Sequence, residues 1–330
     1  MRILFWGTPD FAVPSLRALD EEGFEIVGVV TQPDRPAGRG RKLTPSKVKR
    51  VAVDAGLTVL TPDRPRGDEF AAALRALEPD ISVVVAYGHI LRPEILEIPR
   101  LGSINVHASL LPELRGAAPI NWAIARGHEM TGVTIMRMVE AMDAGPIIHQ
   151  VPEPILEGET AGELTVRLSE IGAQALVEAL ALMTGGAAEE VEQEDDRATY
   201  APKVDRETAK VDWTLPASDI AARVRAMDPI PGAWSRLEDA PVKLYRPVVW
   251  SSDELDALMG DGASTNGGPR AGASHARPGS VVVATPETGV LVAAGEGGVS
   301  FREVQPPGGR RMDAADWING RGVEAGQRFE

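Results

Sequence analysis

Short apolar runs alternate with amphipathic stretches along the first half of the 330-residue chain. The continuous apolar runs predict buried strands at 2–6, 25–30, 57–60, 81–86, 102–106, 132–138 and 145–151. Apolar residues at helical spacing predict helices at 46–55, 68–78, 118–126 and 159–184. Strands of this kind, alternating with helices, are typical of a mostly parallel sheet that is covered on both faces.

The second half of the chain has a different pattern. An acidic, weakly apolar stretch at 187–196 is typical of a linker, and one more helix is predicted at 216–227. Short strand-like runs separated by turn residues predict a small all-β barrel or sandwich, with strands at 241–249, 280–285, 289–293 and 298–304. Residues 251–279 are rich in Gly, Ala and Ser, so we interpret them as a mobile loop insertion, with an interdomain linker as the alternative.

The composition excludes several classes of protein. Hydrophobic residues make up 43% of the chain, which is enough to bury sizeable cores. The absence of cysteine excludes disulfides, zinc–thiolate sites, iron–sulfur clusters and a cysteine nucleophile, and it favours a cytoplasmic location. No run of about 18 apolar residues occurs and the first apolar run is short, so we expect no membrane contact and no signal peptide.

The net charge of −14 argues against a nucleic-acid partner, apart from one basic segment. Residues 31–50 carry seven basic side chains and one acid, Asp34, so this segment has a net charge of +6. Its Gly and Pro residues predict a loop for most of its length. A solvated loop is the simpler interpretation. Because the segment follows the strand predicted at 25–30, its base is also expected at the carboxyl edge of the sheet, where it could contact phosphates.

Polar side chains are expected at the same edge of the sheet. Asn105 and His107 lie two residues apart at the end of the strand predicted at 102–106, so both side chains project from one face. Open α/β sheets place their active sites at this edge. Asp143 occupies a turn after the next predicted strand, so an amide, an imidazole and a carboxylate can converge.

These three groups suit acyl transfer to an external nucleophile. Asn105 and His107 can donate hydrogen bonds to an oxyanion, and Asp143 can orient His107 and favour its charged form. Either His107 or Asp143 can accept a proton from an attacking amine. A structural Asn–His pair and an ordinary turn at Asp143 are the alternative. Motifs for dinucleotides, Walker A phosphates, zinc proteases and α/β-hydrolases are absent, and the spacing of the five histidines indicates no metal site.

Motifs along nearly the whole chain resemble those of the methionyl-tRNA formyltransferase family. They are, in chain order, Gly7–Ala12, Gln32–Gly40, Ala86–Gly88, Asn105–Ile120, Thr131–Met136, Asp143–Gly145, Tyr200–Lys203 and Gln305–Gly308. The Asn105–Ile120 block is shared by folate-dependent formyltransferases and hydrolases, whereas Gln32–Gly40 and the C-terminal motifs indicate the tRNA enzyme. The insertion at 251–279 departs from the family pattern.

The resemblance implies a fold, a reaction and a domain organisation. Residues 1–187 would form a doubly wound, Rossmann-like domain that binds 10-formyltetrahydrofolate. Residues 188–207 would be a linker, and 208–330 an OB-fold-like β-barrel that holds tRNA. The formyl group would pass to the α-amine of methionine on the initiator tRNA. We expect a cytoplasmic monomer that uses no metal.

The resemblance and the charge pattern also assign individual residues. The catalytic residues would be Asn105, His107 and Asp143. The folate site would be lined by Ser109, Leu110, Leu111, Pro112, Ala86, Tyr87 and Gly88. The tRNA would be bound by Arg35, Arg39, Arg41 and Lys42, with a weaker second patch formed by Lys203, Lys243, Arg310 and Arg311.

Three other functions compete with this interpretation. An amino-sugar-nucleotide formyltransferase would use the same chemistry without needing the basic segment or a tRNA-holding barrel. A formyltetrahydrofolate hydrolase would use water as the acceptor. A nucleic-acid-binding module with an inactive first domain is disfavoured by the presence of Asn105, His107 and Asp143.

Overall fold

The computed structural model describes residues 1–37, 40, 42–260 and 276–330. The chain forms two compact units. The first unit consists of Met1–Pro119, Met130–Pro154 and Leu164–Pro202. The second consists of Ile120–Glu129, Ile155–Glu163 and Lys203–Glu330.

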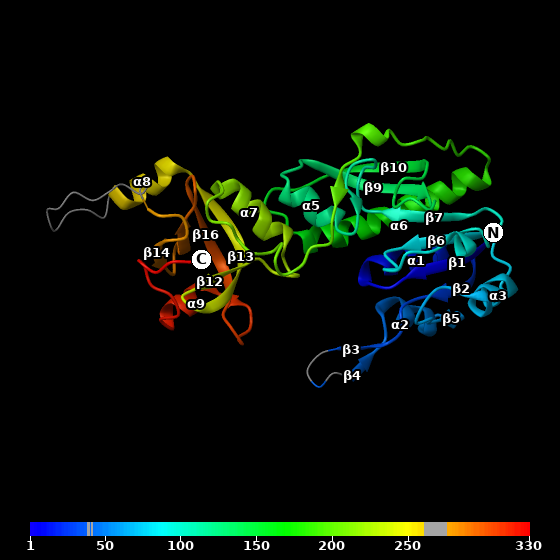
Figure 1. Ribbon diagram of the computed structural model, residues 1–330, viewed down its shortest axis with the longest axis horizontal. Helices are drawn as coiled ribbons and strands as arrows, with labels where there is room; N and C mark the ends of the chain where they lie inside the picture. Colours follow the sequence, from blue (N-terminus) through cyan, green and yellow to red (C-terminus); the bar gives the residue numbers. More distant parts are fainter. Residues whose placement is uncertain (38–39, 41, 261–275) are drawn as a thin grey trace. The chain divides into compact units, whose positions relative to one another are not determined.

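A seven-stranded sheet forms the centre of the first unit (Figure 1). Its strands are, in order across the sheet, β10 (Ile147–Pro154), β9 (Met130–Arg137), β7 (Ser103–His107), β6 (Ile81–Val85), β1 (Arg2–Gly7), β2 (Glu25–Val30) and β5 (Val59–Leu60). β9 is antiparallel to both of its neighbours, β7 and β10, and all the other neighbouring strands pair in parallel. The chain runs outward from β1 to β2 and β5, then returns to β6 and β7 on the other side of β1. The predicted doubly wound, mostly parallel sheet is therefore confirmed, with its topological switch point between β1 and β6.

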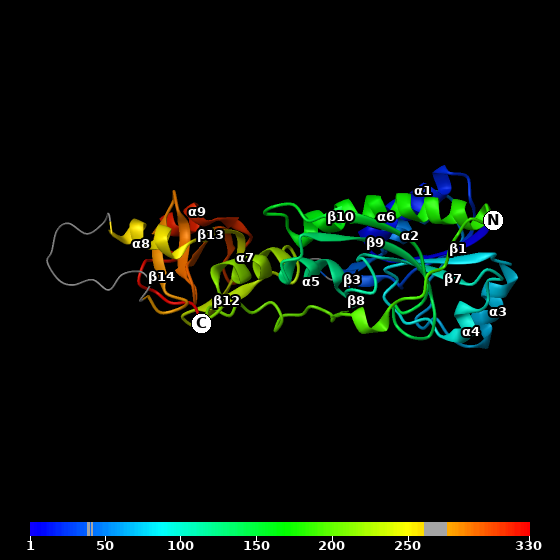
Figure 2. The same ribbon diagram turned by 90° about the horizontal axis from the view of Figure 1, so that it is seen from above.

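Helices cover both faces of this sheet. They are α1 (Val13–Glu21), α2 (Lys47–Asp54), α3 (Asp68–Ala76), α4 (Pro93–Leu96) and α6 (Ala161–Thr184). Figure 2 shows α1 and α6 on one face of the sheet and α3 and α4 on the other. α2 starts after Ser46, whose hydroxyl accepts a hydrogen bond from the Lys49 amide, and such a cap stabilises a helix start. No helix among the described residues is long and apolar enough to span a membrane.

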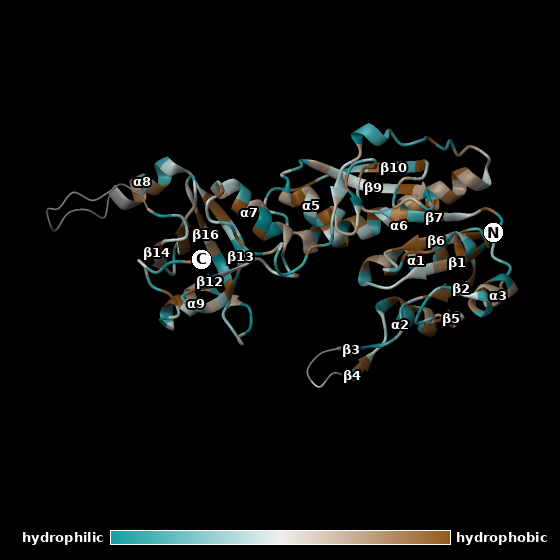
Figure 3. Cartoon of the chain, viewed as in Figure 1, coloured by the Kyte–Doolittle hydropathy of each residue, from teal (hydrophilic) through white to brown (hydrophobic). Residues whose placement is uncertain are grey.

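Large apolar side chains fill the space between the sheet and its helices. All five residues of β6 are buried, and Leu4, Trp6 and Leu74 pack in one core cluster with Tyr87. Figure 3 shows hydrophobic residues concentrated along β1 and β6. A strand that is buried on both faces has a continuous apolar sequence, which is why the predicted range for β6 was accurate to one residue.

The second unit is built on a curled antiparallel sheet (Figure 1). Its strands run, in order, β12 (Trp234–Leu237), β13 (Ala240–Trp250), β16 (Gly298–Gln305), β15 (Gly289–Ala293) and β14 (Val281–Thr285), and β17 (Met312–Asp313) pairs with β16. Its helices are α5 (Pro119–Ala125), α7 (Ala217–Ala226), α8 (Ser252–Gly260) and α9 (Ala314–Asn319). The predicted β domain of the barrel type is thus confirmed, together with four of its strands and the helix at α7.

The segment predicted as an inserted loop at 251–279 contains an ordered helix. Ser251 and Glu254 form a capping box, in which each side chain accepts a hydrogen bond from the main-chain amide of the other. This start signal is followed by α8, in which Leu255 is only 2% exposed and packs in a cluster with Leu291. The prediction of an irregular loop is therefore wrong for Ser252–Gly260. Residues 261–275 lie outside the described part of the chain.

Candidate active site

The imidazole of His107 lies at the carboxyl end of β7, as predicted from the sequence. Asn105 and His107 are two residues apart in β7, so both side chains lie on the same face of the sheet. His107 is 5% exposed and Asn105 is half-buried. Among the described residues, no hydrogen bond involves the Asn105 carboxamide, so its N–H groups are available to a bound molecule.

Asp143 reaches this face through a loop that folds back over the sheet. Because β9 runs antiparallel to β7, its last residue, Arg137, pairs with Ile104 rather than with His107. The loop after β9 must therefore return toward the carboxyl end of β7. Gly145 permits this return, since a Cβ atom there would lie 2.1 Å from the Arg137 carbonyl oxygen.

A short loop segment holds both His107 and Asp143. The Nε2 atom of His107 lies 3.1 Å from the carbonyl oxygen of Leu114. The amide of Gly116 donates a hydrogen bond of 2.8 Å to Oδ2 of Asp143, which lies 3.7 Å from Nδ1 of His107. The expected convergence of His107 and Asp143 is therefore present in the fold.

These contacts determine the charge and tautomer of His107. Burial lowers the pKa of His107 below its ordinary value, and the Asp143 carboxylate and the Leu114 carbonyl oppose this shift only in part. Asp143 favours the charged imidazole, as expected, but loss of solvation outweighs this attraction, so the net shift favours the neutral ring. In the neutral ring Nε2 must carry the proton, since its partner is a carbonyl oxygen. Nδ1 is then unprotonated and faces the carboxylate.

The four residues predicted to line a folate site after β7 divide into two kinds. Ser109 is fully buried, and its hydroxyl donates to the Glu113 carbonyl oxygen at 2.6 Å. Leu111 is 4% exposed, and its amide donates to the Thr134 hydroxyl. Leu110 and Pro112 are half-buried. Ser109 and Leu111 therefore stabilise the loop through buried contacts. Leu110 and Pro112 are the residues with side-chain surface left for a ligand.

The segment after β6 presents main-chain groups rather than the Tyr87 side chain. Tyr87 is 1% exposed and packs edge-on against Trp6, and its carbonyl oxygen accepts hydrogen bonds from Thr8 and Gln32. Ala86 and Gly88 are exposed and have left-handed backbone conformations, with φ of 46° and 87°. Among the described residues, no hydrogen bond involves the main chain of 88–90.

The basic segment is partly an antiparallel hairpin rather than a plain loop. β3 (Arg35–Ala37) pairs with β4 (Lys42–Thr44), and the helix α2 begins at Lys47. Arg35 and Lys42 are exposed on the hairpin, whereas Arg39 and Arg41 lie outside the described residues. Lys47 and Lys49 form ion pairs with Asp10 and Asp34.

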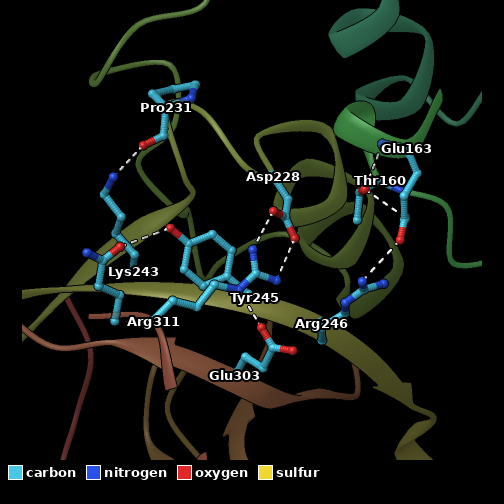
Figure 4. A network of polar contacts seen from close by, with 10 residues as sticks. Thr160, Glu163, Asp228, Pro231, Lys243, Tyr245, Arg246, Glu303 and Arg311 are labelled. Atoms are coloured by element: carbon cyan, nitrogen blue, oxygen red, sulfur yellow. Dashed lines mark hydrogen bonds and ion pairs between the residues drawn. The ribbon is translucent and has the colours of Figure 1, made fainter. Parts of the chain in front are cut away.

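The four basic residues predicted in the second unit have different surroundings. Figure 4 shows Arg311 beside two carboxylates: it binds Asp228 through two hydrogen bonds of 2.7 and 3.0 Å and also pairs with Glu303, over the ring of Tyr245. Its charge is therefore already compensated. Nζ of Lys243 donates to the Pro231 carbonyl oxygen, and Lys203 and Arg310 are exposed.

A pocket in the second unit was not predicted from the sequence. Trp234 lines a pocket of about 290 Å³ together with Arg206, Lys243 and the Gln305–Gly308 motif. The Arg206 guanidinium lies 4.7 Å from the centre of the Trp234 ring, and Lys210 lies 5.9 Å from it. Cations around an aromatic ring become visible only in the fold, because β12 is too short for a periodic signal. Within the described ranges, no group of three or more His, Asp or Glu side chains is arranged to hold a metal ion.

Comparison with known proteins agrees with the motifs. Residues 1–180 match formyl transferase, and residues 203–322 match the formyl transferase C-terminal domain. The chain is 46% identical over 326 residues to methionyl-tRNA formyltransferase of Halorhodospira halophila, covering 99% of this chain and 98% of that protein. It is also 46% identical over 329 residues to the enzyme of the same name from Symbiobacterium thermophilum, covering 100% and 95%.

A solved structure has the same fold. The N-formyltransferase from Helicobacter canadensis, in complex with folinic acid and dTDP-3-aminofucose, superposes with a TM-score of 0.64 at 16% identity. The match covers 94% of this chain and 99% of that one.

The fold and the two domain matches define a formyltransferase, an enzyme of the transferase class. On its identity to full-length relatives, the chain belongs to the methionyl-tRNA formyltransferase family, whose reaction is the formylation of methionyl-tRNA.

Proposed function

We propose that this chain transfers the formyl group of 10-formyltetrahydrofolate to the α-amine of methionine on the initiator tRNA, with Asn105, His107 and Asp143 as its catalytic residues. The observation that carries this proposal is the pairing of His107 with both Leu114 and Asp143 at the carboxyl end of β7. Membership of the methionyl-tRNA formyltransferase family supplies the acceptor.

Each of the three side chains has a distinct role in this reaction. The Asn105 carboxamide donates a hydrogen bond to the oxygen that becomes negative when the amine attacks the formyl carbon. Nδ1 of His107 accepts the proton that the amine loses, because it is the unprotonated atom of the neutral ring. Asp143 then stabilises the resulting imidazolium across the gap of 3.7 Å.

The proton balance of the reaction supports this division of roles. The amine loses one proton as its bond to carbon forms, and the folate nitrogen needs one as its bond to carbon breaks. His107 can carry that proton from one nitrogen to the other. A strong base is unnecessary, because an α-amine has a pKa near 7.7–8.0 in model peptides and is partly neutral at cytoplasmic pH.

The surroundings of 86–90 fit a folate. The exposed main chain of 88–90 offers donors and acceptors to the edge of a pterin ring. Ile90 is 77% exposed and Met142, next to Asp143, is 59% exposed, so apolar surface is available to a flat ring. Leu110 and Pro112 add further lining, whereas the Tyr87 side chain supports the segment from the core. The Helicobacter enzyme, which shares the fold, carries a folate derivative.

The basic hairpin and the second unit are proposed to hold the tRNA. Arg35 and Lys42 of the hairpin have no ion pair among the described residues, and Arg39 and Arg41 belong to the same segment. In the second unit, Lys203 and Arg310 are exposed, and the pocket at Trp234 places a ring beside cations, a combination that suits stacking on bases and contact with phosphates. We assign 1–187 to folate and catalysis and 208–330 to tRNA.

The enzyme is proposed to act as a monomer in the cytoplasm. Asn105, His107 and Asp143 come from one chain, so a monomer is sufficient for catalysis. The absence of cysteine and the use of initiator tRNA support a cytoplasmic location.

One experiment separates the candidate functions. The purified chain is supplied with 10-formyltetrahydrofolate and, in parallel, with methionyl initiator tRNA, an amino-sugar nucleotide or water alone, and formylated product is measured. We expect turnover on the tRNA only. Turnover on the amino sugar, or release of formate without an acceptor, would instead support one of the two rival activities.

A further inference from the structure

The segment just before the second family match is hydrogen-bonded into the candidate active site. β11 (Tyr200–Ala201) pairs in parallel with β8 (Arg115–Gly116), and Val191 forms an antiparallel bridge with Ile147. The hydroxyl of Thr199 accepts a hydrogen bond from the amide of Leu114, the residue that orients His107. Residues 191–201 are thus part of the first unit, although the sequence suggested a linker there.

Gln193 is the residue of this segment that reaches Asp143. Its Nε2 atom donates one hydrogen bond of 2.8 Å to the Asp143 carbonyl oxygen and another of 2.7 Å to that of Gly145. Its Oε1 atom accepts two hydrogen bonds from Arg115, at 3.0 and 2.8 Å. The side-chain amide therefore has all of its donors and both lone pairs engaged, which fixes its orientation.

Arg115 closes the network on its other side. Its guanidinium is 5% exposed and donates also to Asp195, which compensates the buried charge. The next residue, Gly116, donates its amide to the Asp143 carboxylate. Arg115 and Gly116 therefore hold the two ends of Asp143, one end through Gln193 and the other directly.

Asp143 needs such support because of its backbone. Its φ of 51° lies in the left-handed region, which aspartate tolerates better than most residues but which still depends on the contacts around it. The two hydrogen bonds from Gln193 hold the main chain at Asp143 and at Gly145. Loss of these bonds would allow the loop to relax and the carboxylate to move away from His107.

We propose that Gln193 and Arg115 are positioning residues for catalysis, which hold Asp143 in its left-handed conformation beside His107. The inference rests on the catalytic role proposed for Asp143. It makes the Gln193 side chain a support of the active site rather than part of a connection between domains.

The test uses two isosteric exchanges at neighbouring positions in the full-length enzyme. Gln193→Glu keeps an acceptor for Arg115 but replaces the two donated hydrogen bonds with repulsion from two carbonyl oxygens. Glu194→Gln is the matched control, because Glu194 is exposed and, among the described residues, its side chain pairs with Arg197 alone, which is itself exposed. Both are assayed for formyl transfer from 10-formyltetrahydrofolate to methionyl initiator tRNA.

We expect Gln193→Glu to lower kcat by roughly ten- to a hundredfold with little change in KM for either substrate, because small displacements of catalytic groups have effects of this size. Glu194→Gln should stay within about twofold of wild type, as surface substitutions usually do. Combined with Asp143→Asn, Gln193→Glu should cause almost no additional loss, since it acts through the side chain already removed. If Gln193→Glu does not fold, Gln193→Met gives the same comparison without a buried charge.

The outcomes distinguish this inference from the function on which it rests. Normal kcat in Gln193→Glu, or a full additive loss in the double variant, overturns the positioning role while Asp143→Asn alone still shows a large loss of kcat. Near-normal turnover of Asp143→Asn itself overturns the proposed catalytic role of Asp143.

Discussion

The carbonyl oxygen of Leu114 accepts a hydrogen bond from Nε2 of His107, with 3.1 Å between the two atoms. This contact leaves Nδ1 of the neutral ring as the atom that faces both the sheet edge and Asp143. Leu114 has a φ of 60°, and its amide donates a hydrogen bond to the Thr199 hydroxyl. This hydrogen bond helps to hold the backbone conformation that directs the Leu114 carbonyl at His107. A main-chain group, which no substitution of the Leu114 side chain removes, therefore determines which nitrogen of His107 can act as a base.

Replacement of His107 should abolish most of the activity without loss of substrate binding. We expect His107→Ala to lower kcat by on the order of 10²–10⁴, the range for loss of a general base and its charge stabilisation. Asn105→Ala should behave similarly, because it removes the oxyanion donor. Kinetics and folate binding by isothermal titration would check both, and near-normal turnover in His107→Ala would remove it from the mechanism.

The pH dependence of stability should report the burial of neutral His107. Its folded pKa is lowered, so at pH values below the ordinary 6.5 the unfolded chain binds a proton there that the folded chain does not. Stability is therefore complete above this pH and falls below it, by up to about 1.4 kcal/mol per pH unit from this residue. Urea unfolding between pH 7 and 5 should show a shallower decline for His107→Gln than for wild type. Equal slopes would mean that His107 is charged in the folded enzyme.

The Asp143 carboxylate should influence the pH profile of catalysis. Its charge opposes the lowering of the His107 pKa by burial. In Asp143→Asn this opposition is lost, so the acid limb of kcat/KM should move to lower pH while the maximal rate falls. A limb that moves to higher pH would show that Asp143 does not stabilise the imidazolium.

The sequence could predict parts of the site that depend on local pattern. Asn105 and His107 follow from a two-residue spacing at the end of an apolar strand, and the sheet follows from continuous apolar runs. Arg115 and Gln193 could not be found in this way, because they are 78 residues apart and β8 and β11 have two residues each. The helix α8 was missed because the Gly, Ala and Ser content of 251–279 obscured the capping box at Ser251.

Leu255 should stabilise the second unit, in contrast to the rest of the inserted segment. Its side chain is buried against Leu291, so Leu255→Ala should lower the free energy of unfolding by about 2–4 kcal/mol through lost burial and a new cavity. Chemical unfolding would measure this. Leu258→Ala is the control on the same helix, since Leu258 is 37% exposed and should have a much smaller effect. An equal effect of both variants would show that α8 does not pack as a single amphipathic face.

The basic hairpin should determine the salt dependence of tRNA binding in this acidic protein. Replacing Arg39, Arg41 and Lys42 together with Ala removes three cations from the segment that carries the local excess of positive charge. If each cation meets one phosphate, the slope of log affinity against log salt should become shallower by about 2–3 units, with kcat/KM on initiator tRNA strongly reduced. Folate binding should not change, because none of the three replaced residues belongs to the segment 86–90 or to the residues after β7 that are proposed to line the folate site. Replacing the exposed residues Arg64, Arg66 and Arg75 with Ala removes the same charge elsewhere in the first unit and should leave the slope unchanged.

An unaltered slope in the hairpin variant, with normal turnover of the tRNA, would mean that the hairpin is only a solvated surface element. Recognition of the acceptor would then have to come from other residues.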